Sequence, residues 1–176
     1  MSYSSDRLLL GGDRESRVSR FRAWVLFAVP FAAILFQIYV PLFYQFLSFL
    51  DLPLLVVVYF ALMRRSQIGG LAIGALVGLA QDSLSKNPLG MFGIVNTLVG
   101  YFAASVGVRF DVEHGLIRLP LVFLFYIFHQ FFYWVLSRAL LGHQMSLEPQ
   151  RVLVLALLNA VVGVSLFYFL DKLRQR

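Results

Sequence analysis

The chain has 176 residues, of which 60% are hydrophobic and 14% are charged, with no cysteine and a net charge of +6. The charged fraction is about half that of an average soluble domain, which excludes a water-soluble globular protein and indicates helices in a lipid bilayer. The lack of cysteine excludes disulfides and thiolate chemistry, and basic residues scattered between apolar runs favour lipid headgroups over nucleic acid as their partner.

The apolar runs predict an all-α polytopic membrane protein. Residues 1–22 are polar, mix arginines with acids and have no helical periodicity, so we expect a mobile cytoplasmic tail. Residues 23–171 then form one membrane domain of six transmembrane helices. The expected spans are residues 24–43, 52–63, 68–81, 89–108, 119–141 and 152–170. The second span is short, so we expect it to borrow length from the preceding turn or to lie in thinned bilayer.

The basic residues predict the orientation of these spans, because lysine and arginine concentrate in cytoplasmic loops. With the N-terminus inside, twelve of the fifteen basic residues fall on the cytoplasmic side. Only Lys86, Arg138 and Arg151 fall on the other side, and the last two sit at span ends from which they reach the headgroups. We therefore predict a multi-pass protein of the bacterial inner membrane with both termini in the cytoplasm.

Small residues recur at helical spacing on two of the expected spans. Gly70, Gly74 and Gly78 line one face of the third span, and Ala28 and Ala32 repeat the pattern on the first. Such residues let a second helix backbone approach closely. The pattern predicts helix packing at both places, and leaves open whether the second helix belongs to this chain or to a partner subunit.

Asp82 stands at the outer end of the third expected span. A carboxylate at membrane depth is a hypothesis for a functional site, but a shift of one helical turn, about 5 Å, returns it to water. We therefore expect Asp82 to cap the outer loop, with Asn87 or Lys86 as its partner.

The other polar groups within the spans give no sign of catalysis. Such side chains usually form hydrogen bonds between helices, and this is what we expect of Gln37, Asn96, His129, Gln130 and Asn159. His129 has no second histidine one turn away, so a metal site is not indicated. No serine has a partnered base, and phosphate-binding loops are absent. The sequence therefore predicts no enzyme activity, no metal and no cofactor.

Residues 51–107 carry a recognisable order of motifs. They contain the apolar helix DLPLLVVVYFALMRR, the glycine-spaced helix GGLAIGALVGLAQD, the loop SLSKNPLGMFG and a span with LVGYFAA. This order resembles the rod shape-determining protein MreD family. The resemblance implies that the acid and the turn, Asp82, Pro88, Leu89 and Gly90, and the ridge residues Gly74 and Gly78, are family positions, none of them catalytic.

The resemblance also implies a function and a set of partners. It implies a non-enzymatic membrane scaffold of the cell-elongation machinery, which synthesises peptidoglycan and maintains rod shape. The implied partners are the single-span protein MreC, the actin-like MreB filament, the RodA glycosyltransferase and its class B penicillin-binding transpeptidase.

A second reading follows from a further likeness of that family. Its fold resembles the substrate-binding subunit of energy-coupling-factor vitamin transporters, six helices with a pocket open toward the outside. The alternative function is therefore a vitamin-transporter subunit, whose pocket needs convergent polar groups. Asn96, Asn159, His129 and Asp82 supply them if they face one cavity. The sequence leaves open whether side chains, lipid or a small molecule fill it.

Overall fold

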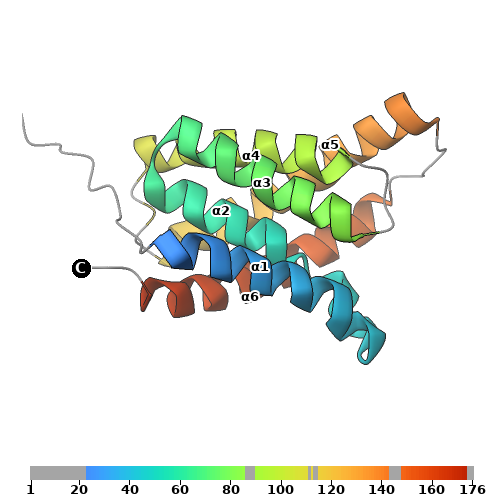
Figure 1. The fold of residues 1–176 in the computed structure, drawn as a ribbon, viewed down its shortest axis with the longest axis horizontal. Helices are drawn as coiled ribbons and strands as arrows, with labels where there is room; N and C mark the ends of the chain where they lie inside the picture. Colours follow the sequence, from blue (N-terminus) through green and yellow to red (C-terminus); the bar gives the residue numbers. More distant parts are fainter. Residues whose placement is uncertain (1–22, 86–89, 111, 113–114, 143–147, 174–176) are drawn as a thin grey trace, which may run out of the picture.

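The computed structural model describes residues 23–85, 90–110, 112, 115–142 and 148–173, and these residues are all-α (Figure 1). The expected tail at residues 1–22 lies outside them. The helices are α1 (Ala23–Tyr39), the 3-10 turns η1 (Val40–Leu42) and η2 (Gln45–Phe49), α2 (Leu52–Arg64), α3 (Gln67–Leu84), α4 (Met91–Arg109), α5 (Gly115–Leu141) and α6 (Pro149–Asp171). The all-α prediction is confirmed, and each expected span overlaps one α-helix.

Helix α2 forms the centre of the bundle. Residues 53–63 are all buried, and the helix contacts each of the other five α-helices. Figure 1 shows it running between α3 and α1. A helix that is apolar on all sides is stable only when neighbours cover every face. Its 13 residues extend about 20 Å, and because protein surrounds it, this short helix has no lipid-facing side to match to the bilayer.

Four helical segments of the described chain are long and apolar enough to cross a membrane. They are Trp24–Leu42, Met91–Arg109, Gly115–Leu140 and Pro149–Asp171. The two remaining expected spans are α2, which is short, and α3, whose 18 residues include four glycines and carry Gln81 and Asp82 in the last turn. The structure therefore defines a multi-pass membrane protein with four candidate spans.

The glycine ridge of α3 packs against α4 of the same chain. A Cβ atom added at Gly70, Gly74 or Gly78 would collide with a backbone carbonyl oxygen of α4. In order, those oxygens belong to Gly100, Asn96 and Phe92. Glycine is required here by the close approach of two backbones. Since α4 covers the ridge, it is a contact within the chain and offers no surface to a partner subunit.

An ion pair ties three helices together at the end where α5 begins. Arg118 lies 2.6 Å from Asp171 of α6 and donates from Nε to the Val112 carbonyl, while the Tyr59 hydroxyl of α2 donates to the other Asp171 oxygen. Helix α5 already begins at Gly115, four residues before the expected span of residues 119–141. The arginine is tolerated inside the helix because a carboxylate and a carbonyl satisfy it.

Candidate functional site

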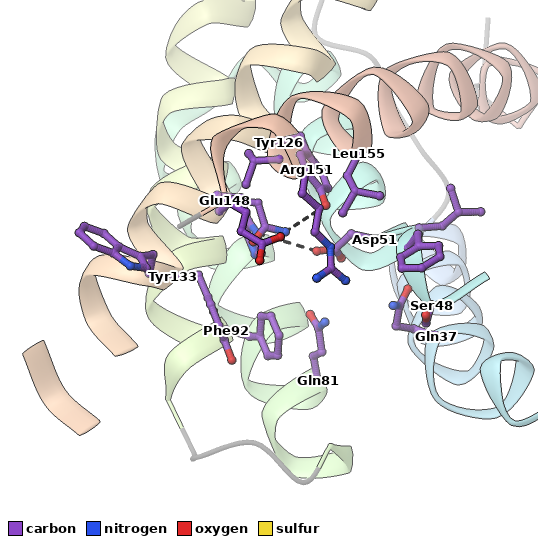
Figure 2. Close-up of a pocket in the computed structure, with 16 residues that line it drawn as sticks. Gln37, Ser48, Asp51, Gln81, Phe92, Tyr126, Tyr133, Glu148, Arg151 and Leu155 are labelled. Atoms are coloured by element: carbon purple, nitrogen blue, oxygen red, sulfur yellow. Dashed lines mark hydrogen bonds and ion pairs between the residues drawn. The ribbon is translucent and has the colours of Figure 1, made fainter. Parts of the chain in front are cut away.

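A cavity of about 730 Å³ opens at the end of the bundle where α2, α4 and α6 begin. This volume lies in the range of about 300–1,000 Å³ typical of small-molecule sites. In Figure 2 Asp51, Glu148 and Arg151 meet near the centre, with Phe92 and Gln81 below them. The aromatic lining comprises Phe49, Phe92, Tyr126, Tyr133 and Trp134. The charged and polar lining comprises Gln37, Ser48, Asp51, Gln81, His129, Gln130, Glu148 and Arg151.

The chain holds Asp51 in place through its own backbone and through α6. Oδ1 of Asp51 accepts a hydrogen bond from the Leu54 amide at 3.2 Å, which caps the N-terminus of α2. Its backbone N–H donates to Asn159 Oδ1 at 2.9 Å. The Asn159 amide in turn donates to the Phe49 carbonyl. These bonds fix the carboxylate at the cavity wall, with Oδ2 unused by the cap.

His129 of α5 is the most unusual group of the lining. Its side chain is 2% exposed, and neither ring nitrogen has a hydrogen-bond partner among the described residues. Nδ1 lies 3.8 Å from Asp51 Oδ2, which is beyond hydrogen-bond length. The ring stacks against Phe92 and Tyr133, with centroids 6.0 and 6.4 Å away. The interhelical hydrogen bond expected for His129 is therefore absent from the described part of the structure.

Arg151 and Glu148 bring opposite charges to the mouth of the cavity. Both lie at the start of α6 and both are exposed. Within the ranges that the structure describes, neither forms an ion pair or a side-chain hydrogen bond. The cavity therefore presents two carboxylates, from Asp51 and Glu148, and one guanidinium, and nothing in the described chain neutralises that guanidinium.

Asp82 has a structural role beside the cavity. It is 1% exposed and accepts hydrogen bonds from the backbone amides of Gly90, Phe92 and Gly93 at 2.9–3.1 Å. These amides belong to the N-terminal turn of α4, where a negative charge is favoured. Gly90 has φ +98°, a conformation that suits glycine. The acid thus caps α4 and does not line the cavity.

Of the family positions implied for the following turn, only Gly90 is described. Pro88 and Leu89 lie outside the described residues, as do Lys86 and Asn87, the expected partners of Asp82.

Of the four polar candidates for a pocket, only His129 lines the cavity. Asn159 fixes the chain before α2, and Asn96 donates to Gln81 at 3.3 Å. Sequence reasoning missed Asp51, Glu148 and Arg151, because each follows or precedes an apolar run and so resembles an ordinary span end. The topology alone could have indicated that these three residues lie close together, because an up-and-down bundle brings the starts of the second and sixth spans to the same end.

The two alanines of α1 remain uncovered. Ala28 and Ala32 are both exposed, and α1 contacts α2 and α3 through a different face, which includes Val25, Ala33 and Ile34. No helix of the described chain occupies the small-residue face, in contrast to the glycine ridge of α3.

The fold and the cavity define the class of the molecule, a multi-pass α-helical membrane protein with a polar cavity at one end. Among the described residues no group of three potential metal ligands exists. Residues 18–176 match the family model described as rod shape-determining protein MreD, and the chain belongs to this family. The resemblance read from residues 51–107 is thereby confirmed.

Family membership assigns the chain a role in determining rod shape, within a family that is generally not catalytic. Comparisons with curated proteins and with solved structures find no match. The expected likeness to the transporter subunit fold consequently has no solved structure to support it.

Proposed function

We propose that the chain is a non-enzymatic scaffold of the bacterial cell-elongation machinery, which holds an MreC-like single-span protein against the peptidoglycan synthase complex. The family match supports the role in rod shape. The further partners in this proposal are an MreB-like filament, a RodA-type glycosyltransferase and a class B penicillin-binding protein.

In this proposal all six helices cross the inner membrane, with both termini in the cytoplasm. The described basic residues at the end away from the cavity are Arg64, Arg65, Arg109, Arg118 and Lys172, and those at the cavity end are Arg138 and Arg151. This asymmetry supports the orientation, since lysine and arginine are retained on the cytoplasmic side. The cavity then opens toward the outside.

The observation that carries the docking proposal is the uncovered small-residue face of α1. Ala28 and Ala32 lie one turn apart, beside the exposed side chains of Phe27 and Phe31. In lipid, helices associate by close packing and not by hydrophobicity, so a face with small residues is where a second helix gains most contact. The transmembrane helix of the MreC-like protein packs on this face.

Bulky residues on this face test the docking. Replacing both alanines (Ala28→Leu and Ala32→Leu) should reduce co-purification of an MreC-like protein by about tenfold, the effect of losing roughly 1.4 kcal/mol of binding free energy. Thermal unfolding of the isolated protein should change little, because both positions are exposed. The matched control is Ala72→Leu with Ala139→Leu, at exposed alanines of α3 and α5. Undiminished co-purification in the α1 variant would refute this docking face.

The cavity is the one observation that favours the alternative, a vitamin-transporter subunit. Its volume suits a small molecule. Native mass spectrometry of protein purified gently from its own membrane separates the two functions. Single-span and synthase subunits in the complex support the scaffold, whereas a stoichiometric water-soluble vitamin released on unfolding supports the transporter subunit.

A further inference from the structure

The cavity contains polar groups that lack a partner in the protein. His129 is buried with both ring nitrogens unpaired among the described residues. Buried polar groups in native proteins are nearly always hydrogen-bonded, so the unpaired imidazole needs an explanation. Arg151 and Glu148, both exposed, face the same space without an ion pair to any described residue (Figure 2). The buried histidine and the charges at the mouth together point to a ligand that brings its own donors and charges.

One part of the cavity suits a positive group that carries N–H donors. Asp51 Oδ2 and His129 Nδ1 lie 3.8 Å apart. A single ammonium group has three donors and reaches both acceptors at once when the imidazole is neutral. The rings of Phe92, Tyr126 and Tyr133 line the same space, and aromatic faces attract cations.

Arg151 supplies a complementary site for a negative group. Its guanidinium has no partner in the described chain, and its planar fork matches the oxygens of a phosphate better than an ammonium would. A ligand with one ammonium and one phosphate satisfies both ends of the cavity. It also adds no net charge to a site that already holds carboxylates and a guanidinium.

A second hollow adjoins this polar cavity. It has a volume of about 810 Å³ and shares Phe49, Glu148, Arg151 and Leu155 with the cavity. Its lining combines Glu148, Gln150 and Arg151 with the apolar residues Phe49, Pro149, Val154 and Leu155, and Val154 is 63% exposed. Because Val154 and Leu155 belong to a candidate membrane span, we expect the apolar part of this lining to border the lipid. The ligand therefore has a polar head and an apolar tail that leaves sideways.

We propose that the cavity binds a zwitterionic phospholipid of the outer leaflet. Its ammonium lies between Asp51 and His129, its phosphate binds Arg151, and its acyl chains run along Val154 and Leu155. A peptide segment of a partner protein with a lysine and an acidic residue carries the same charges, but it has no acyl chain to fill the second hollow. This inference goes beyond the scaffold function, whose docking face on α1 does not include the cavity.

Lipid titration followed by native mass spectrometry tests the proposal. The delipidated full chain is titrated in detergent with dioleoyl forms of phosphatidylethanolamine, phosphatidylglycerol and phosphatidylcholine. Phosphatidylethanolamine should bind about tenfold more tightly than the other two, because only it has both a phosphate and an ammonium with N–H donors. Phosphatidylglycerol lacks the ammonium, and phosphatidylcholine lacks its N–H groups.

Two variants locate the site. Asp51→Asn and Arg151→Gln should each weaken phosphatidylethanolamine binding by about tenfold, the effect of one lost charge-assisted contact. Asparagine is as good a helix cap as aspartate, so the first variant keeps the start of α2 intact. The control is Lys172→Gln, which removes a cation at the opposite end of the bundle and should leave binding unchanged.

Three outcomes would contradict the lipid proposal. Equal binding of all three lipids, or full binding by both variants, overturns the proposal. So does a photo-crosslinker placed at Val154 in cells that labels a partner protein and no lipid, since it assigns the cavity to a peptide segment. Failure of the α1 docking test leaves these lipid measurements unaffected, so the two proposals fail separately.

Discussion

The α3–α4 interface and the cavity beside Asp51 use space in opposite ways within one bundle. At the interface two backbones touch, and no glycine of the α3 ridge has room for a Cβ atom. At the cavity the helices stand apart, and a buried histidine has no partner among the described residues. Gln81 and Phe92, from the closed pair, form one wall of the open space. The close packing of α3 and α4 thus provides a fixed wall for the cavity that α5 and α6 leave open.

The largest effect is expected from filling the closed region. Gly74→Leu places a side chain where the Asn96 carbonyl and the Thr97 backbone already lie. The helices have to separate, and because backbone cannot yield as a side chain does, we expect a loss of about 3 kcal/mol or more in the free energy of unfolding. Membrane insertion should persist, because hydropathy hardly changes. Thermal and denaturant unfolding in detergent measure the loss.

The control for this variant lies on the same helix. Ala72→Leu adds the same bulk at an exposed position and should change stability by no more than about 0.5 kcal/mol. If Gly74→Leu were as stable as Ala72→Leu, the backbone contact between α3 and α4 would contribute nothing to the fold.

The closed region was largely predictable from the sequence, and the open region was not. The four-residue spacing of Gly70, Gly74 and Gly78 predicts a close contact between two helices, because only small residues at that spacing let the backbones approach. The identity of the second helix required the structure. The six helices were likewise predictable, since each corresponds to one apolar run. The ion pair of Arg118 could not be predicted, because its partner, Asp171, is 53 residues away.

The cavity depends on separations that no local pattern encodes. Asp51 precedes α2, His129 lies in α5 and Arg151 in α6, so the three span a hundred positions of the chain. Whether His129 finds a hydrogen-bond partner depends on distances across the bundle, such as the 3.8 Å to Asp51. Hydropathy places Asp51 and Arg151 next to span ends, which fits a cavity lining and an ordinary loop boundary equally well, and it places His129 in the middle of the fifth span.

An intermediate effect is expected where the two regions join, at the cap of α4. In Asp82→Asn one acceptor oxygen becomes an N–H donor that faces the amides of Gly90 and Gly93 or of Phe92. We expect a loss of about 1–2 kcal/mol in unfolding free energy, typical of a lost helix cap or charged hydrogen bond. Hydrogen exchange should accelerate at these amides before the rest of α4. The acid Glu148, at the same end but without a partner among the described residues, gives the control Glu148→Gln, for which neither quantity should change.

The smallest effect on stability, and the sharpest contrast, is expected at His129. In His129→Phe an imidazole without hydrogen bonds in the described structure is exchanged for an apolar ring of similar shape, so unfolding free energy should change by no more than about 0.5 kcal/mol. Phosphatidylethanolamine binding should nevertheless fall about tenfold, since one acceptor for the ammonium is gone.

The comparison variant is Asn159→Leu. It also removes a buried polar group near Asp51, but the side chain of Asn159 forms hydrogen bonds with the backbone before α2. It should cost about 2 kcal/mol, because it leaves the partly buried Asp51 amide and Phe49 carbonyl without this partner. Equal destabilisation by the two variants would mean that the histidine already has a partner within the protein, and the cavity would then have no need of a ligand to satisfy it.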